Sequence, residues 1–395
     1  MLYSIIENYS SKPYSMHAQP EKIAIIGGGI AGLTLAICLK GKGYHCQIFE
    51  KQAELREVGA AISIFPNALR VFRALGMMED ILASSGEMTQ VFMKTAQGKI
   101  LAKSEPQYDL PTVCMHRADL HSILLKHTSA ELFPAHELST LDNLPDGKVE
   151  VVFQNEMTKT FDAVIGADGI HSAVRQYVIG DGKPVFRGYN IWRGIVDADF
   201  AIGYGSETYG IGKRVGIVPI KDGKYGWWAS YNEDFMQDDA PEGTAAKLQR
   251  LFGHWHHPIP ELMAKTEHIL KNSLADRLPK AGWSKGNVTL LGDAAHPTTP
   301  NLGQGGCMAI EGAYLLAKAI EKYGLGAKAF QRYEALHFPR TKSVTEESLR
   351  MGKMGQLENS LAIFFRNYLF RIMPSSLAMK MIDKYFSYDV CKVEV

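Results

Sequence analysis

The sequence lacks a cysteine framework. Its 395 residues contain five cysteines, at positions 38, 46, 114, 307 and 391, and no two of them form a C-x-x-C pair. An odd count without close spacing excludes the disulfide scaffold of a small secreted protein and the paired ligands of a structural zinc site. We therefore predict reduced thiols, a cytoplasmic protein and no bound metal.

Charge of one sign and long apolar runs are also missing. The 43 Lys and Arg residues nearly balance the 42 Asp and Glu residues, so the net charge is only +1. This balance argues against a nucleic-acid partner. No run of about 18 apolar residues occurs, so we expect no spanning helix and no stable membrane insertion. Residues 1–20 lack the pattern of a signal peptide and are interpreted as a loose N-terminal extension, with Met1 or Met16 as the start.

Glycine, by contrast, is concentrated where a strand meets a helix. The stretch IAIIGGGIAGLTLAICLK, residues 23–40, places Gly27, Gly29 and Gly32 in a G-x-G-x-x-G pattern between a β-branched run and an apolar helical run. Gly27 permits a tight turn, Gly29 leaves room for a pyrophosphate, and Gly32 lets the helix pack closely on the strand. A second strand ends in Glu50, whose carboxylate can accept hydrogen bonds from a ribose 2′-hydroxyl. The unit predicts FAD or NAD rather than NADP, although a structural turn without ligand is the alternative for the glycines alone.

Two later segments favour a flavin. VIGADGIHSAVR, residues 164–175, is a strand ending in Asp168 and followed by a helix start. LLGDAAHPTTPNLGQGGCMAIEGAYLLAKAI, residues 290–320, contains a second glycine-rich helix start. A plain NAD dehydrogenase needs neither segment. Asp293 can hydrogen-bond ribityl hydroxyls, and the backbone N–H groups of residues 303–306 can stabilise an anionic reduced flavin.

The texture of the chain changes between about residues 185 and 235, where short runs rich in Tyr and Trp alternate with glycine turns. Such runs are typical of an antiparallel sheet. We predict an α/β protein in which a Rossmann-like FAD-binding domain carries an inserted antiparallel-sheet substrate domain and is followed by C-terminal helices. The predicted parts are an N-terminal extension at 1–20, a discontinuous FAD-binding domain at 21–85, 112–184 and 273–330, a substrate-binding domain at 86–111 and 185–272, and C-terminal helices at 331–395.

These motifs together resemble those of the single-component (group A) FAD-dependent aromatic hydroxylases, which share the p-hydroxybenzoate hydroxylase fold. GGGIAG at 27–32, the D-G motif at 166–175 and the G-D motif at 292–300 occur in the family's order. Arg117-x-x-Leu120-x-x-x-Leu124 resembles the helix whose Arg contacts FAD. HPTTPNLGQGGCMAIE and GYNIWRGI are most similar to the urate hydroxylase, zeaxanthin epoxidase and tetracycline-inactivating branches. The resemblance covers residues 21 to 345 and implies non-covalent FAD, held by Gly27, Gly29, Ile30, Ala31, Gly32, Glu50, Lys51, Arg117, Asp168, Asp293, Pro300, Gly303, Gln304, Gly305 and Gly306.

The sequence departs from the family at three places. Gly312 stands where Asp usually follows Glu311, and His337 stands where the usual Tyr-Glu-x-x-Arg has its Arg. Urate hydroxylases bind substrate with an Arg, matched by Arg214, and with a Tyr twelve residues later, where this chain has Gly226. The resemblance therefore does not predict urate as the substrate.

The resemblance also implies the reaction. In this family NADH or NADPH reduces the flavin, O2 adds to it as a C4a-hydroperoxide, and one oxygen atom hydroxylates or epoxidises an aromatic or conjugated small molecule. The catalytic positions implied are Arg214, Pro300 and Gly303, of which Pro300 and Gly303 line the oxygen side of the flavin. Candidate substrate-binding residues are Tyr189, Trp192, Arg193, Arg214 and Trp228, with a place in the sheet's core, or a solvated charge for the arginines, as the alternative.

Several alternatives stay open. A flavin oxidoreductase without oxygen insertion and a non-catalytic FAD-binding protein would carry the same nucleotide motifs, whereas a flavin halogenase would need a W-x-W-x-I-P stretch that GWWASYN at 226–232 does not supply. His296 is expected to hold its loop through hydrogen bonds rather than to act as a base. The stretch 361–386 is expected to be a packed helix pair, with membrane contact as the alternative. A monomer and a homodimer are both compatible with the sequence.

Overall fold

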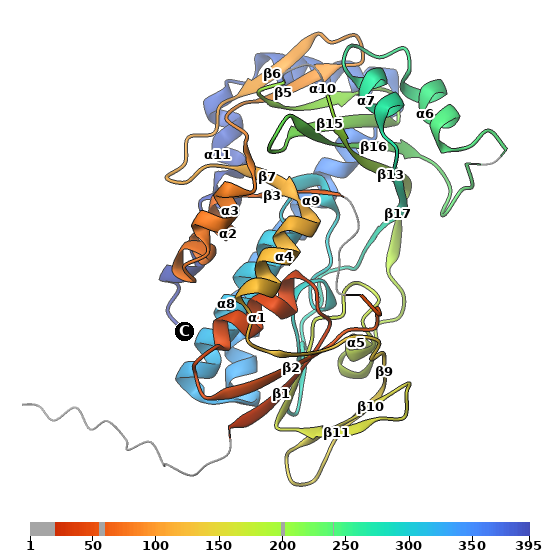
Figure 1. Ribbon diagram of the computed structural model, residues 1–395. Coiled ribbons are helices and arrows are strands. Elements are labelled where there is room, and N and C mark those ends of the chain that lie inside the picture. Colours follow the sequence, from red (N-terminus) through yellow and green to blue (C-terminus); the bar gives the residue numbers. More distant parts are fainter. Residues whose placement is uncertain (1–19, 55–59, 199–201, 240) are drawn as a thin grey trace, which may run out of the picture.

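A computed structural model gives the structure of the protein and describes residues 20–54, 60–198, 202–239 and 241–395. All but the last residue of the predicted N-terminal extension lies outside the described residues. The predicted fold class is confirmed, because a mostly parallel sheet with helices is joined to an antiparallel sheet and long C-terminal helices follow both (Figure 1).

The nucleotide-binding half is built on a six-stranded sheet. Its strand order is β18-β19-β12-β1-β2-β8, and every pairing is parallel except that of β18 with β19. The central strands are β-branched and buried, as a parallel sheet covered on both faces requires. The strands are β1 (Glu21–Ile26), β2 (Tyr44–Phe49), β8 (Glu131–Phe133), β12 (Ala163–Gly166), β18 (Ser284–Lys285) and β19 (Val288–Leu290).

Helices cover one face of this sheet and a small sheet covers the other. All ten residues of α1 are buried, and α1 packs against both α8 and α4. On the opposite face, the ring of Phe49 of β2 stacks on Phe153 of the three-stranded sheet β11-β10-β9, with the two ring centroids 4.5 Å apart. It also stacks on Phe133 of β8, at a centroid distance of 4.8 Å. The elements are α1 (Ile30–Leu39), α2 (Pro66–Ala74), α3 (Met78–Ala83), α4 (Arg117–His127), α5 (Ala173–Val178), α8 (Gly305–Tyr323), β9 (Leu138–Asn143), β10 (Val149–Phe153) and β11 (Thr158–Phe161).

The second half is a seven-stranded sheet with the order β17-β13-β16-β15-β14-β5-β6, antiparallel except between β14 and β5. It unites a segment near residue 100 with the segment after residue 185. The predicted boundary between residues 272 and 273 cuts β17, which continues to Asp276 in the same sheet. The strands are β5 (Val91–Thr95), β6 (Ile100–Ser104), β13 (Val185–Asp197), β14 (Gly205–Tyr209), β15 (Lys213–Pro219), β16 (Lys224–Asn232) and β17 (Leu270–Asp276).

The two faces of this larger sheet have different neighbours. One face packs on α6 and α7, with a core that contains Trp227 and Phe252. The other face meets the small sheet β3-β7-β4, where Trp228 packs near Cys114. This second face is the one turned toward the nucleotide-binding half. The elements are α6 (Thr244–Phe252), α7 (Ile259–Lys265), β3 (Ala61–Ile64), β4 (Gly86–Glu87) and β7 (Val113–His116).

The C-terminal helices connect the two halves. α9 packs along α8, and just beyond its end Gln356 hydrogen-bonds Ser230 and Asn232 of the larger sheet. α10 and α11 contact β6 at the far end of that sheet (Figure 1). Among the described residues, no helix combines the length and the apolar character needed to cross a bilayer. The elements are α9 (Ala327–Gly355), α10 (Ser360–Ile372), α11 (Ser375–Phe386) and the 3-10 helices η1 (Gly292–Ala294), η2 (Pro300–Leu302) and η3 (Val390–Lys392).

Candidate active site

The loop between β1 and α1 has the geometry of a phosphate-binding turn. Gly27 has φ +112°, and a Cβ on Gly32 would lie 2.2 Å from the carbonyl oxygen of Gly27, so packing requires both glycines as expected. Gly29 differs because its backbone is extended (φ −81°, ψ −171°), a conformation that any residue adopts, where it caps α1. Backbone conformation therefore does not explain Gly29, whereas close approach of a ligand to the start of α1 does.

Glu50 is held against this loop. Its Oε2 accepts a hydrogen bond of 2.9 Å from the backbone N–H of Gly28, and its Oε1 accepts one of 2.9 Å from Gln52. The buried ring of His121, on α4, contacts the Gly28 carbonyl oxygen through Nε2 at 2.8 Å. Nothing in the sequence motifs pointed to His121. Of the remaining predicted residues here, Ile30 and Ala31 are buried within α1 and Lys51 is exposed.

Asp293 and Arg117 come from different loops and interact electrostatically. Arg117 begins α4, and Asp293 lies in η1 after β19. Desolvation raises the pKa of the Asp293 carboxyl, and the positive charge of Arg117 opposes this rise. The Asp293 side chain is nevertheless exposed. A carboxyl group that is exposed and also desolvated by surrounding protein is placed where a bound ligand could reach it.

The D-G and G-D motifs are tied together by Arg175. Its guanidinium donates hydrogen bonds of 2.8 Å and 2.7 Å to the carbonyl oxygens of Ala294 and Ala295, beside Asp293. Asp168 holds its own loop, because its carboxylate accepts hydrogen bonds from Ser172 and from the backbone N–H groups that begin α5. Asp168 therefore acts here first as a helix cap.

The start of α8 forms the third turn. Pro300 begins η2 and is exposed, and Gly303 follows with φ +66°, where a Cβ would lie 2.9 Å from the ring of Phe65. A Cβ on Gly305 would have its nearest neighbour at 3.6 Å, so packing leaves room there, whereas one on Gly306 would lie 3.0 Å from Ile62. Of these three glycines, Gly305 is the one at which packing leaves room beside the N-terminus of α8.

Gln304 is anchored beneath this turn. Its Oε1 accepts a hydrogen bond of 2.9 Å from Asn67, which also donates to Glu311. Glu311 is fully buried and pairs with Arg340 of α9 at 3.1 Å. The buried Nε2 of Gln304 has no hydrogen-bond partner among the described residues. An unpartnered buried donor beside a glycine turn fits a ligand with acceptor atoms at this place.

The ends of β1, β12 and β19 thus bring three separate sequence motifs to one edge of the six-stranded sheet. The features available to a dinucleotide are the Gly29 turn, the acceptor Glu50, the Arg117–Asp293 pair, the spare donor of Gln304 and the N-terminus of α8. These residues fit FAD.

Arg214 joins the large sheet to the α8 turn. Its guanidinium contacts Glu207 at 2.8 Å and donates to the side chain of Asn301, the residue after Pro300. Tyr209 donates to the other oxygen of Glu207 at 2.6 Å. Burial alone would lower the pKa of Arg214, but the charge of Glu207, the hydrogen bond to it and the nearby Tyr189 and Tyr209 together raise that pKa. Arg214 is therefore a buried, neutralised cation rather than a free one.

Three other predicted substrate residues lie on the same face of the sheet. The Tyr189 hydroxyl is 3.4 Å from Asn301 Oδ1, and desolvation raises its pKa. Trp228 lies over Gly216, where a Cβ would be 1.9 Å from the indole. Arg193 donates to Asn272, and desolvation, together with the nearby charge of Arg117, lowers its pKa. An aromatic and cationic surface therefore faces the α8 turn.

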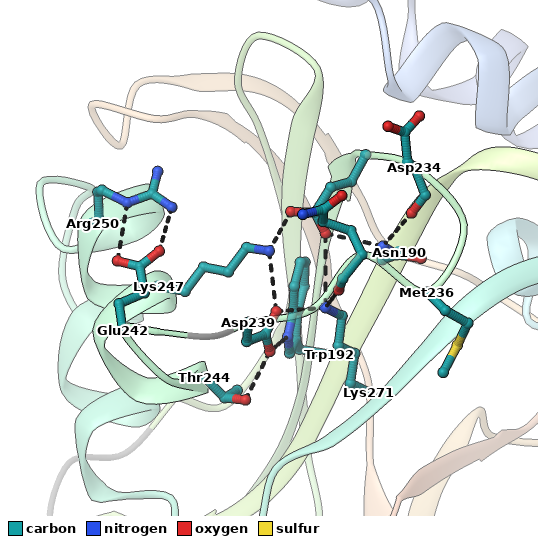
Figure 2. Close-up of polar contacts among 12 residues, drawn as sticks. Asn190, Trp192, Asp234, Met236, Asp239, Glu242, Thr244, Lys247, Arg250 and Lys271 are labelled. Carbon is teal, nitrogen blue, oxygen red and sulfur yellow. Dashed lines mark hydrogen bonds and ion pairs between the residues drawn. The ribbon is translucent and has the colours of Figure 1, made fainter.

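Trp192 is different, because the structure contradicts the prediction that it binds substrate. It is fully buried on the opposite face, in the core under α6. Its Nε1 donates to Asp239 at 3.1 Å, and Asp239 also pairs with Lys247 and Lys271 (Figure 2). Because side chains alternate along a strand, Trp192 and Arg193 point to opposite faces.

The expectation that His296 holds its loop through side-chain hydrogen bonds is wrong. Both of its ring nitrogens lack partners among the described residues, and the ring packs 5.6 Å from Trp283 and 5.1 Å from His337. Desolvation lowers the pKa of His296 to about 3, so the ring is neutral. Across the described ranges, no group of three or more His, Cys, Asp or Glu side chains is arranged to hold a metal ion.

The residues that sequence reasoning missed are polar partners from distant segments. They carry no motif of their own, and the only signal was the predicted proximity of the segments on which they lie. They are Asn67, His121, Glu207, Asn301 and Arg340.

Comparison with known proteins agrees with this geometry. Residues 21–347 match the family described as FAD binding domain. The chain is 35% identical over 373 residues to the aurachin C monooxygenase/isomerase of Stigmatella aurantiaca, covering 89% of this chain and 94% of that protein. It is 32% identical to the 3-amino-4-hydroxybenzoate 2-monooxygenase of Streptomyces cremeus, covering 84% and 87%. The crystal structure of Klebsiella pneumoniae HpxO with FAD and uric acid superimposes with a TM-score of 0.85 at 25% identity, covering 94% of this chain and 98% of that one.

A match over most of the chain, together with three converging turns that fit FAD, identifies the protein as an oxidoreductase. The chain belongs to the FAD binding domain family, as an FAD-dependent monooxygenase of the aromatic hydroxylase type.

Proposed function

We propose that the protein uses NADH or NADPH and O2 to hydroxylate or epoxidise an aromatic or conjugated small molecule. The observation that carries this proposal is the face formed by Tyr189, Trp228 and Arg193, of which the Tyr189 hydroxyl lies 3.4 Å from Asn301 in the turn before α8. Bound FAD would supply the redox chemistry of this reaction, in which the nicotinamide nucleotide is the reductant, one oxygen atom of O2 enters the substrate and the other leaves as water.

The chain's own residues would bind and orient that cofactor. Glu50 would accept hydrogen bonds from the ribose, Asp293 would bind the ribityl chain, and Arg117 would offset negative charge. Gln304 Nε2 and the N–H groups of Gly305 and Gly306 would meet the polar edge of the ring, where the α8 dipole favours negative charge. Pro300 and Gly303 would line the oxygen side.

The substrate class follows from the same face. Tyr189 and Trp228 offer aromatic surface. Arg193 offers a positive charge that its partner Asn272, an uncharged amide, does not neutralise. This pairing favours a planar substrate with an acidic or phenolic group. Two relatives are named for aromatic substrates, which agrees with this proposal. Urate itself is disfavoured, because a Cβ on Gly226 would lie 2.2 Å from Ala61 and leaves no space for a tyrosine.

Arg214 is proposed as a positioning residue. Its charge is already paired with Glu207, and its second contact, Asn301, belongs to the turn that carries Pro300 and Gly303. It would fix that turn against the substrate sheet. We further propose a cytoplasmic protein, monomeric or homodimeric, since the free cysteines suit a reducing compartment.

The test is an aerobic turnover assay. The FAD-loaded protein is mixed with NADH or NADPH and a panel of phenols and aminohydroxybenzoates, while O2 uptake and product mass are followed. A product that gains one oxygen atom, labelled when 18O2 is supplied, supports the proposal. Substrate-dependent oxidation without that gain supports a flavin oxidoreductase. A flavin that neither nucleotide reduces, with any ligand, supports a non-catalytic FAD-binding protein.

A further inference from the structure

α10 turns its large apolar side chains to solvent. Six of them are between 45% and 65% exposed, although an ordinary surface helix points such residues toward the core. Their spacing follows the helical repeat, so they form one continuous stripe along the helix. The residues of this apolar stripe are Leu361, Phe364, Phe365, Tyr368, Leu369 and Ile372.

The orientation of α10 is fixed from its inner side. Arg366 is 5% exposed, donates to the Met354 carbonyl oxygen at 3.2 Å and lies over the ring of Tyr209 at 4.9 Å. Asn359 caps the helix through the N–H groups of Leu361 and Ala362. Rotating α10 to bury the stripe would expose these contacts. The outward direction of the stripe is therefore built into the packing.

Positive charge accompanies the stripe. On the next helix, α11, Leu377 and Met381 are also exposed, at 51% and 46%. Residues 360–386 contain four basic residues and one acidic residue, Asp383, in a chain whose net charge is only +1. Arg371, Lys380 and Lys384 are exposed beside the apolar side chains. Exposed Phe, Tyr and Leu rimmed by Lys and Arg are typical of a helix that lies in a membrane interface.

We propose that α10 and α11 form a peripheral docking surface for anionic phospholipid bilayers. The positive charge of α10 and α11 favours an anionic bilayer over a second copy of the chain as the partner of this surface. A two-fold dimer through the stripe would bring the same basic side chains together and repel, whereas anionic headgroups attract them. Since neither helix can span a bilayer, the contact is interfacial and reversible. The inference does not depend on the reaction that the protein catalyses.

Vesicle flotation of the full-length, FAD-loaded protein tests this surface. Vesicles of phosphatidylcholine alone are compared with vesicles of equal parts phosphatidylcholine and phosphatidylglycerol. We expect partition into the anionic vesicles at least about tenfold above that into the neutral ones, weakened by salt. The variant F364Q/F365Q/L369Q removes apolar contacts, and R371Q/K380Q removes charge. Each should lower binding to anionic vesicles about tenfold or more.

The matched control is F235Q/L278Q, which replaces apolar side chains that are 63% and 64% exposed elsewhere on the molecule. It should bind vesicles as the unmodified protein does. All substituted side chains are exposed, so the flavin spectrum and melting temperature report whether each variant is folded. Absence of vesicle binding, equal binding by the stripe variant, or a dimer that the stripe variant dissociates would each overturn the proposal. Equal partition into neutral vesicles would overturn the requirement for anionic lipid.

Discussion

The guanidinium of Arg214 is hydrogen-bonded to the side chain of Asn301, although the two residues belong to different halves of the fold. Arg214 lies on β15 of the large sheet, and Asn301 lies in η2 of the turn before α8. The same guanidinium is paired with Glu207 on the neighbouring strand β14. The sheet face proposed to bind substrate and the turn proposed to meet the flavin are thus connected through one buried cation.

Replacing Arg214 should lower two quantities: the free energy of unfolding, and the fraction of oxidised nicotinamide nucleotide that yields oxygenated product. Substrate affinity should change less. R214Q leaves Glu207 buried without its cation, and the expected loss is about 3–5 kcal/mol in the free energy of unfolding. The double variant E207Q/R214Q should recover part of this loss, because the uncompensated charge is gone. Denaturant unfolding measures both effects.

In turnover, the double variant should oxidise the nicotinamide nucleotide with a smaller fraction appearing as oxygenated product, at a nearly unchanged KM. A raised KM with unchanged coupling and unchanged stability would instead mean that Arg214 contacts the substrate directly.

Gly29 offers a test of cofactor placement that separates binding from folding. Its extended backbone suits any residue, and serine is a better helix cap than most. G29S should therefore leave the melting temperature of the apoprotein unchanged or slightly raised. It should weaken FAD binding at least about tenfold, because a side chain now stands where the pyrophosphate approaches α1.

The control for G29S is G203S, since Gly203 has no neighbour within 4 Å of an added Cβ. Both proteins are titrated with FAD and followed by flavin fluorescence. Full FAD affinity in G29S would place the pyrophosphate elsewhere.

The nucleotide-binding half was predictable because its signals are local. Gly27 is favoured by its positive φ, Gly32 is required by contacts with Gly27 and Ile25, and the buried strands carry continuous β-branched runs. The acid at the end of β2 could be assigned by spacing alone. Each of these features depends on the chain's immediate neighbours, so one sequence suffices to recognise it.

The substrate sheet was predictable as a sheet but not as a surface. Trp192 and Trp228 look equivalent in the sequence, yet Trp192 is buried under α6 and Trp228 lies on the opposite face, near Cys114. Alternation along a strand separates two faces without saying which of them a later helix will cover. The polar partners Asn67, Glu207 and Arg340 depend on contacts between distant segments, for which a single sequence gives no register.

Acid should destabilise the protein through its buried histidines. Burial lowers the pKa of His296 to about 3, and the pKa of His337 lies well below its ordinary value for the same reason. Below about pH 6.5 the unfolded chain therefore binds protons that the folded protein does not. The free energy of unfolding should fall by about 1.4 kcal/mol per pH unit for each histidine as pH drops below 6.5.

H337Q should reduce this slope, since glutamine keeps a donor for the Met308 carbonyl oxygen but does not titrate in this range. H268Q, which changes an exposed histidine, is the control and should keep the full slope. Urea unfolding at several pH values with constant excess FAD measures it. An unchanged slope in H337Q would show that His337 is protonated in the folded state, or that it does not cause the loss of stability in acid.

Two of the departures from the family's motifs, Gly312 and His337, meet in space, which predicts that they are energetically coupled. A Cβ on Gly312 of α8 would lie 2.9 Å from Nε2 of His337 on α9. G312D alone should therefore destabilise the protein by about 1–3 kcal/mol through overpacking and a buried carboxylate, despite the better helix propensity of Asp over Gly. H337R alone should also destabilise it, because a guanidinium would be buried beside the rings of Trp283 and His296 without a partner. The double variant supplies each new charge with the other, so its loss should be smaller than the sum by at least about 0.5 kcal/mol. Denaturant unfolding of the four proteins closes the cycle, and strictly additive losses would show that the two positions are independent.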